Sequence, residues 1–296
     1  MGEHVLVIGA GRDLAARMRA RTGVRTTTLV RVTKLAKVRR PADNDRVIAL
    51  SEDAPGEWLA YAGFVHSHDP VDRVAAFSEL DQDKAAAIAD RLGLPFHSAR
   101  TVRNVTDKLA MRRTLAEAGV ERVGCEEVSG PDDVTALLGR WGALVLKPVG
   151  GTGSKGVSVV RAAADVPSAW RWSSGDGRAQ LIAEQYLDGA EFSVEAFSEG
   201  GEHEIVATTR KFKDDRHFVE TGHHVPAGLP DRTERAVRRH VAAVLDALGV
   251  RNGPTHTEVI LTASGPATVE THLRLGGDSI PELVADATGV DLFDLT

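Results

Sequence analysis

The sequence has little of several residue types, and each shortage excludes a class of protein. Cys125 is the only cysteine among 296 residues, so no disulfide can form within the chain and we expect a reducing compartment, the cytoplasm. Aromatic residues make up 5%, and acidic residues outnumber basic ones by 42 to 36. Bulk electrostatics therefore give no attraction to nucleic acid or to an anionic membrane, and an anionic partner must be bound by local charges.

Long apolar runs are also missing. The first run, residues 5–8, is interrupted by Gly9-Ala10-Gly11 and is too short for a signal-peptide core or a bilayer crossing. No later apolar run comes near the length of a bilayer crossing either, so we expect no membrane segment. With 42% hydrophobic and 26% charged residues, the chain has a folded protein's composition and suffices for roughly two domains of about 150 residues.

The first hundred residues predict an α/β layer. Residues 4–8, followed by glycine and an apolar helical pattern, indicate a Rossmann-like strand that turns into a helix. We expect further strands at 47–50 and 63–66, and a helix over 84–92 that ends at Gly93. The dinucleotide fingerprint is incomplete because Leu14 stands where a third glycine belongs. An NADP-linked oxidoreductase that uses the first glycines and Arg31 is kept as a third hypothesis.

The remainder of the chain predicts an α+β module. Apolar periodicity indicates helices over 106–118 and 131–141, from Asp231 to Leu248, and from about Pro281. Extended segments are expected at 143–149, 157–161, 180–186, 191–198, 204–210, 256–262 and 267–273.

Basic residues are concentrated between Asp13 and Asp43, where no acidic residue occurs. They are Arg17, Arg19, Arg21, Arg25, Arg31, Lys34, Lys37, Arg39 and Arg40. We interpret them chiefly as a solvated surface, because no aromatic stacking residue is interleaved; a phosphate-binding face is the alternative. His66 and His68 are interpreted as structural residues on one strand face, since no third ligand stands at metal spacing.

A glycine-rich segment lies between two predicted strands. Residues 147–157 include Gly151, Thr152, Gly153 and Ser154, flanked by Lys147 and Lys155. Backbone N–H groups without a neighbouring Cβ can approach phosphate oxygens closely, and hydroxyl and ammonium groups add donors. A flexible hairpin is the alternative for this segment alone.

Carboxylates converge near the end of the chain. Glu270, His272 and Arg274 occupy alternate positions of one strand, and Glu258 lies on the preceding strand of a hairpin. Two such carboxylates repel unless a cation neutralises them, and oxygen ligands suit Mg²⁺. A solvated sheet face is the alternative.

Taken in order, these residues resemble the ATP-grasp superfamily, and within it the carboxylate–amine ligases that include L-amino-acid ligases. The motifs that carry the resemblance are residues 104–108 (NVTDK) with Arg112, 218–223 (FVETGH), 253–258 (GPTHTE) and 274–278 (RLGGD). The resemblance implies a pre-ATP-grasp, Rossmann-like domain over 1–105 and a two-lobed ATP-grasp domain over 106–296, with lobes at 106–187 and 188–296.

The resemblance also implies roles for single residues. Lys108 and Lys147 would contact the ATP phosphates under the glycine loop, Glu184 and Leu187 would frame the adenine, and Glu191 would bind the ribose. Glu258 and Glu270 would hold Mg²⁺, with His272 where the family has asparagine. Arg274 would stabilise the transferred phosphoryl group, and the substrate pocket would include Glu220, His223, Gly276 and Gly277.

The expected activity is an ADP-forming ligation of a small-molecule carboxylate to an amine through an acyl phosphate. Amino acids are the expected carboxylate and amine substrates. A homodimer is left open. The second hypothesis is a non-catalytic ATP-binding scaffold or sensor. It is motivated by His272 and by the end of the chain at Thr296, soon after the last motif.

Overall fold

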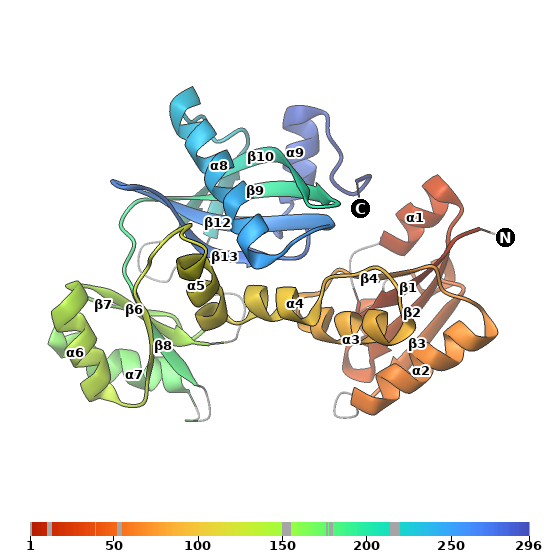
Figure 1. Cartoon of the computed structure of the whole chain (residues 1–296), viewed down its shortest axis with the longest axis horizontal. Coiled ribbons are helices and arrows are strands. Elements are labelled where there is room, and N and C mark those ends of the chain that lie inside the picture. Colours follow the sequence, from red (N-terminus) through yellow and green to blue (C-terminus); the bar gives the residue numbers. More distant parts are fainter. Residues whose placement is uncertain are drawn as a thin grey trace.

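The computed structural model describes residues 2–10, 14–38, 40–51, 55–149, 155–175, 177, 180–213 and 220–295. For residues 14, 15, 21, 22 and 55 it describes the backbone alone. The described strands form three sheets, with one at each end of the molecule and the largest between and above them (Figure 1). Short 3₁₀ turns lie at Val32–Lys37, Pro41–Asp43, Glu79–Asp81 and Ala163–Asp165.

The N-terminal sheet is parallel, with strand order β3-β2-β1-β4. Its strands are β1 (His4–Ile8), β2 (Arg25–Arg31), β3 (Arg46–Leu50) and β4 (Arg73–Ala76). The helices of this region are α1 (Leu14–Thr22), α2 (Pro55–His68) and α3 (Gln82–Leu92).

Side-chain alternation along β1 explains how this sheet is covered. Val5 and Val7 pack with Met18 of α1 on one face. Leu6 and Ile8 join a cluster with residues of α2 and α3 on the other. A parallel strand buried on both faces needs such a continuous apolar run, and the sequence supplies it.

The strand predicted at 63–66 is wrong, because these residues lie inside α2. Trp58, Ala62 and Val65 are buried at helical spacing, and that period outweighs the short apolar run around Phe64. His66 and His68 therefore lie on a helix. The backbone N–H of Val71 donates to His66 Nδ1 at 3.1 Å, in keeping with a structural role.

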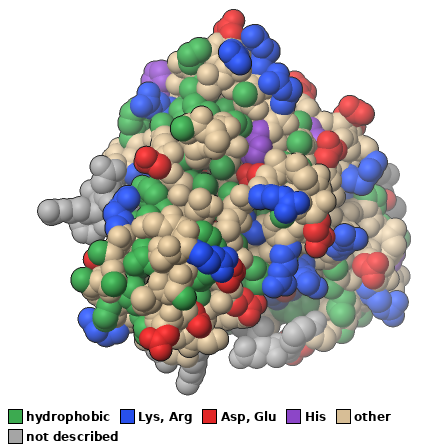
Figure 2. Space-filling view, turned by 60° about the vertical axis from the view of Figure 1, so that its left-hand side comes forward, with side chains coloured by type: hydrophobic (Ala, Val, Ile, Leu, Met, Phe, Trp, Pro, Cys, Tyr) green, Lys and Arg blue, Asp and Glu red, His purple; other side chains and the backbone are tan. Residues whose placement is uncertain are grey.

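Several basic residues of the N-terminal region form ion pairs with aspartates. Arg25 pairs with Asp69 at 2.8 Å, and Arg31 pairs with Asp81 at 2.8 Å. Lys/Arg and Asp/Glu side chains are mixed across the face shown in Figure 2.

In the described part of the chain, no helix is both long and apolar enough to span a bilayer.

The second sheet has the order β5-β8-β6-β7 and antiparallel neighbours. It consists of β5 (Cys125–Val128), β6 (Leu144–Pro148), β7 (Ser158–Val160) and β8 (Leu181–Gln185), and its helices are α6 (Pro131–Trp141) and α7 (Val166–Ser174). Leu144, Leu146 and Val134 are fully buried in the core between this sheet and the two helices.

The third sheet is antiparallel, with the order β11-β10-β9-β12-β13. Its elements are β9 (Ala190–Glu199), β10 (Glu202–Lys213), β11 (Glu220–His224), β12 (Gly253–Thr262) and β13 (Gly265–His272), with α8 (Asp231–Leu248) and α9 (Ile280–Thr288). The buried stripe of α8, including Val237, Val241 and Leu245, packs with Phe192 and Val259 of the sheet.

Two helices connect the sheets along the chain (Figure 1), α4 (Ala99–Thr106) and α5 (Lys108–Glu117). The Asp107 carboxylate caps α5 by accepting hydrogen bonds from the N–H groups of Leu109 and Ala110, at 2.9 and 3.0 Å. The cap fixes Lys108 at the first position of the helix. The predicted combination of a parallel α/β layer with an α+β module is confirmed; the boundaries at 105 and 187 stay predictions.

Candidate active site

The hairpin of β12 and β13 places two carboxylates side by side. Glu258 is the register partner of Glu270, with a bulge directly after Glu258. Like charges in this position are destabilising on their own. The site must therefore supply positive charge close to both.

Lysines supply part of this charge. The Lys108 ammonium lies 3.1 Å from Glu270, and Lys211 of β10 lies 2.5 Å from Glu258. Burial opposes ionisation of Glu270, but the hydrogen bond from His272 and the charge of Lys108 outweigh it and lower its pKa to about 2. Burial likewise works against ionisation of Glu258, yet His256 and Lys211 hold its pKa well below the usual range.

Lys211 forms the centre of a second acidic group. Besides Glu258, its ammonium contacts Glu220 at 2.6 Å and Glu191 at 3.1 Å. Burial alone would lower the pKa of Lys211, but the carboxylates reverse the effect and raise it. Lys213 also pairs with Glu191, and His223 lies 2.9 Å from Glu220. Lys211 was not among the predicted site residues, because the strand expected at 204–210 ended one residue before it.

Histidines line the other side of the carboxylate pair. His256 lies 2.6 Å from the buried Glu195 and 3.5 Å from Glu258, and its ring stacks on that of His272. Burial favours the neutral ring of His256, but Glu195 and Glu258 overcome it and raise the pKa to about 10.

His272 and Arg274 meet a carboxylate from the N-terminal region. Glu79, in the turn after β4, lies 3.0 Å from His272 Nδ1 and 3.2 Å from Arg274. His272 Nε2 lies 3.3 Å from Glu270. Burial would lower the pKa of His272, but its two carboxylate partners raise it. Its imidazolium form is thereby favoured.

Lys147 belongs to a neighbouring buried group. Its ammonium pairs with Glu184 of β8, and Arg112 of α5 donates to Glu184 Oε1 at 3.0 Å. Burial raises the pKa of Glu184, but Arg112 and Lys147 together lower it to about 2. Lys108 connects the two groups electrostatically. Burial alone would lower its pKa, but Glu270, Glu79 and Glu184 raise it.

The donor set suits a hard divalent cation. Ligand atoms of Glu258, Glu270 and His272 lie within 4.8 Å of one another, as do those of Glu191, Glu220 and Glu258. Carboxylate oxygens are the donors that Mg²⁺ prefers. Glu258 and Glu270 therefore fit this ion, whereas a protonated His272 could not ligate it, so its metal role stays a prediction.

The remaining predicted residues lie in the connections between these elements. Leu187 lies in the connection between β8 and β9, and Gly277 accepts a hydrogen bond from the N–H of Ile280 at the start of α9. Gly276 lies against His256 and Glu195, where a Cβ would come 2.9 Å from His256 Nδ1. The predicted loop residues Gly151, Thr152, Gly153 and Ser154 lie outside the described residues.

Comparison with known proteins identifies the fold family. Residues 142–282 match the ATP-grasp domain, so the chain carries an ATP-grasp domain and the resemblance seen in the sequence is confirmed. The chain is similar to the L-amino acid ligase from Bacillus licheniformis, with a TM-score of 0.83, 25% identity, and coverage of 100% of this chain and 73% of that one.

Curated relatives point the same way. Alanine–anticapsin ligase of Bacillus subtilis is 27% identical over 76% of this chain and 53% of its own length. D-alanine–D-alanine ligase of Cupriavidus metallidurans is 28% identical over 81% of this chain and 76% of its own length. The chain spans about half the length of the first of these relatives.

Proposed function

We propose that this protein is an ATP-dependent carboxylate–amine ligase. One observation carries the proposal: a paired Glu258 and Glu270, surrounded by lysine and histidine cations, lies in an ATP-grasp domain next to the buried pair of Lys147 and Glu184. Such an arrangement matches the need of phosphoryl transfer for alignment and charge neutralisation rather than for a protein nucleophile.

The reaction has two steps. A substrate carboxylate oxygen attacks the γ-phosphorus of ATP, the bond to the bridging oxygen breaks, and ADP leaves. The neutral amine then attacks the carbonyl carbon of the acyl phosphate, the bond to the phosphate oxygen breaks and inorganic phosphate leaves, and the nitrogen releases one proton to water, which gives the amide. Water must be excluded between the two steps, since it would hydrolyse the acyl phosphate.

The residues would share this work as follows. Lys108 and Lys147 would hold the nucleotide phosphates, and Arg274 would contact the transferred phosphoryl group. Glu184, Leu187 and Glu191 would hold the nucleoside. Glu220 and His223 would bind substrate, together with Gly276 and Gly277. Glu258 and Glu270 would hold Mg²⁺, which offsets phosphate charge when bound.

Amino acids are the proposed substrates. The support comes from the relatives' names, which describe ligation of alanine to anticapsin, of D-alanine to D-alanine, and of L-amino acids. A homodimer and a cytoplasmic location stay predictions.

A non-catalytic ATP-binding scaffold or sensor is the second candidate. The observation that favours it is His272, whose two ring nitrogens both face carboxylates, Glu79 and Glu270, at a position where the family has a neutral asparagine. A protonated ring at this position would compete with a metal for the charge of Glu270.

The deciding experiment is a coupled assay of ADP release with pairs of amino acids and Mg²⁺. We expect release that depends on both substrates. Glu270→Gln should lower it roughly 100-fold, because one of the two metal-binding carboxylates is lost. Glu199→Gln, at an exposed position of β9, is the matched control. ATP binding by the native protein without amino-acid-stimulated ADP release would favour the scaffold instead.

A further inference from the structure

Arg112 is a buried residue of α5 to which the proposed reaction assigns no task. Its side chain has five N–H donors, and all five have acceptors. Nε donates to Glu184 Oε1 at 3.0 Å, Nη1 to Glu121 at 2.7 Å and to the Thr268 carbonyl at 2.6 Å, and Nη2 to Glu184 Oε2 and the Val269 carbonyl at 3.5 Å each.

These acceptors belong to two different sheets. Glu184 lies on β8 of the four-stranded sheet, and Thr268 and Val269 lie on β13 of the five-stranded sheet. Glu184 is the partner of Lys147, and Val269 directly precedes Glu270 in the chain. One guanidinium therefore connects the lysine on one side of the site to the carboxylate strand on the other.

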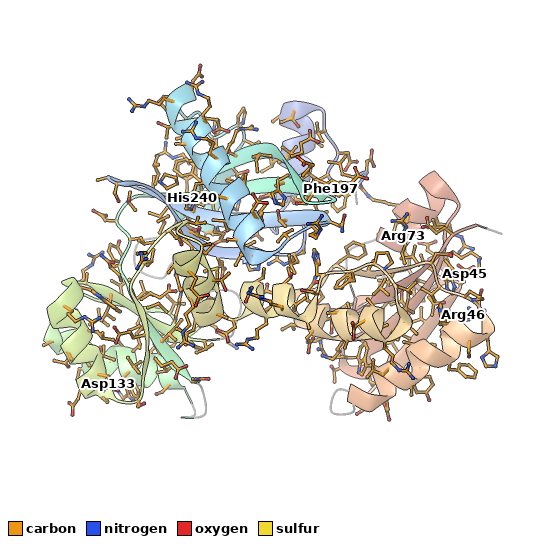
Figure 3. The ribbon with its side chains drawn as sticks, in the orientation of Figure 1. Asp45, Arg46, Arg73, Asp133, Phe197 and His240 are labelled. Carbon is orange, nitrogen blue, oxygen red and sulfur yellow. The ribbon has the colours of Figure 1, made fainter. Side chains whose placement is uncertain are left out.

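The same strand position is held from a second side. Glu121 Oε2 accepts a hydrogen bond from the Thr268 N–H at 2.8 Å, and His240 Nε2 lies 2.9 Å from Thr268 Oγ1. His240 projects from α8, and Figure 3 labels its place on that helix. It also lies 3.3 Å from Glu121. Thr268 is thus fixed through its N–H, its carbonyl and its side chain.

Charge balance gives Arg112 a further effect. With Lys147 as its only partner, Glu184 would cancel the lysine charge. Arg112 shares Glu184, and its own charge is divided between Glu184 and Glu121. Part of the Lys147 charge therefore remains for an anionic ligand, and it acts strongly because the surroundings are buried.

We propose that Arg112 is a positioning residue that joins the two sheets around the nucleotide: it orients Glu184 beside Lys147 and holds β13 where Glu270 enters the site. The nucleotide part of this inference rests on the proposed function. Lysine cannot replace Arg112, because an ammonium has three donors and no planar fork, which leaves buried acceptors unpaired.

The test measures ADP binding by titration calorimetry in folded Arg112→Lys protein. Arg113→Lys is the matched control, since Arg113 is the exposed neighbour on the same helix. We expect about tenfold weaker ADP binding for Arg112→Lys, as for the loss of charge-assisted hydrogen bonds, and native binding for the control.

A double-mutant cycle separates positioning from general structural support. In a Glu184→Gln background, Arg112→Lys should change ADP affinity less than about threefold, because the group that Arg112 orients is already altered. An equal loss in both backgrounds would contradict positioning through Glu184.

Hydrogen exchange of the backbone amides of residues 265–272, which form β13, is measured on the same variants without ligand. Arg112→Lys should speed exchange there at least tenfold relative to Arg113→Lys. Should Arg112→Lys fail to fold, Glu121→Gln should speed the same exchange, because glutamine keeps only one oxygen for the two donors, Arg112 and the Thr268 N–H, that now use one carboxylate oxygen each. Unchanged exchange in the folded variants overturns the inference. If the native protein binds no ADP, the proposed function fails, and exchange alone decides whether Arg112 holds β13.

Discussion

Each buried carboxylate of the candidate site has a cation within reach. Glu184 has Arg112 and Lys147, Glu270 has Lys108, and Glu258 has Lys211. A buried charge without a partner costs several kcal/mol, on the order of 3–5 when one partner of a pair is removed. The charges of the site are thus paired with one another, and we expect a phosphate to bind by competing with the glutamates for the same cations.

His97 gives a residue-scale prediction about stability. It lies in the connection between α3 and α4, and burial lowers its pKa from 6.5 to about 4. Below pH 6.5 His97 binds a proton in the unfolded chain but not yet in the folded protein. The free energy of unfolding therefore decreases as the pH falls from 6.5 to 4. We expect His97→Gln to remove up to about 1.4 kcal/mol per pH unit of this slope.

Urea unfolding at pH 4.5 and pH 7 measures the effect. His68→Gln replaces an exposed histidine of α2 and serves as the control, with the native slope retained. The same slope in His97→Gln and in the native protein would refute the assignment.

At the residue scale, sequence motifs predicted many of the residues that gather here but not their partners. Glu258, Glu270 and Arg274 stand in recognisable motifs. Lys211 and Glu79 do not, because their importance comes from distant pairings, of Lys211 with Glu258 and of Glu79 with Arg274, that only the fold creates.

At the element scale, long amphipathic patterns predicted several helices but not α2, part of which was predicted as a strand. The helix predicted over 131–141 is α6, and the one from Asp231 is α8, whose apolar stripe and C-terminal glycine are both in the sequence. Strand β2 was not predicted, because Thr26, Thr27 and Thr28 are buried polar residues. Their partners are remote in the chain, such as Asn44, which accepts from Thr28 at 2.7 Å.

Gly276, which follows β13, gives a prediction about how closely the backbone passes the side chains of His256 and Glu195. A Cβ on Gly276 would come 2.9 Å from His256 Nδ1 and 3.1 Å from Glu195 Oε2, whereas a Cβ on Gly277 meets no atom within 4 Å. We expect Gly276→Ala to lower the free energy of unfolding by about 1–3 kcal/mol through overpacking, and Gly277→Ala to stay within about 0.5 kcal/mol.

Urea denaturation of the two alanine variants provides the comparison. Each is the other's control, since both residues lie in one turn and take the same substitution. If both alanine variants lower the free energy of unfolding equally, the conformation of the turn requires glycine at both positions, and the lack of space beside His256 is not the cause.

At the scale of the whole molecule, the candidate site draws on all three sheet regions. Glu79 follows the parallel sheet, Lys147 lies on the four-stranded sheet, and Glu258 and Glu270 lie on the five-stranded one. Periodicity alone could not predict this convergence, because it assigns elements and not their mutual placement. The order of motifs could, since it resembles a family whose members share the arrangement.

A ligand that bridges these regions should stabilise them together. ADP with Mg²⁺ at about 100 times its dissociation constant adds about 2.7 kcal/mol to the folded state, which corresponds to a rise in Tm of roughly 4 °C for a chain of this length. Chelation of the metal should reduce the rise, because the Glu258–Glu270 pair then faces the phosphates without a bridging cation.

Hydrogen exchange locates that stabilisation. We expect MgADP to slow exchange in β6 and β8 and also in β12 and β13, since Lys147 and Glu184 lie on the first pair and Glu258 and Glu270 on the second. In Glu270→Gln the protection of β6 and β8 should remain, because their contacts with the nucleotide do not depend on that carboxylate. Protection limited to one sheet of the native protein would show that the nucleotide binds elsewhere, since MgADP held by Lys147 on one sheet and through its metal by Glu270 on the other would restrain both sheets at once.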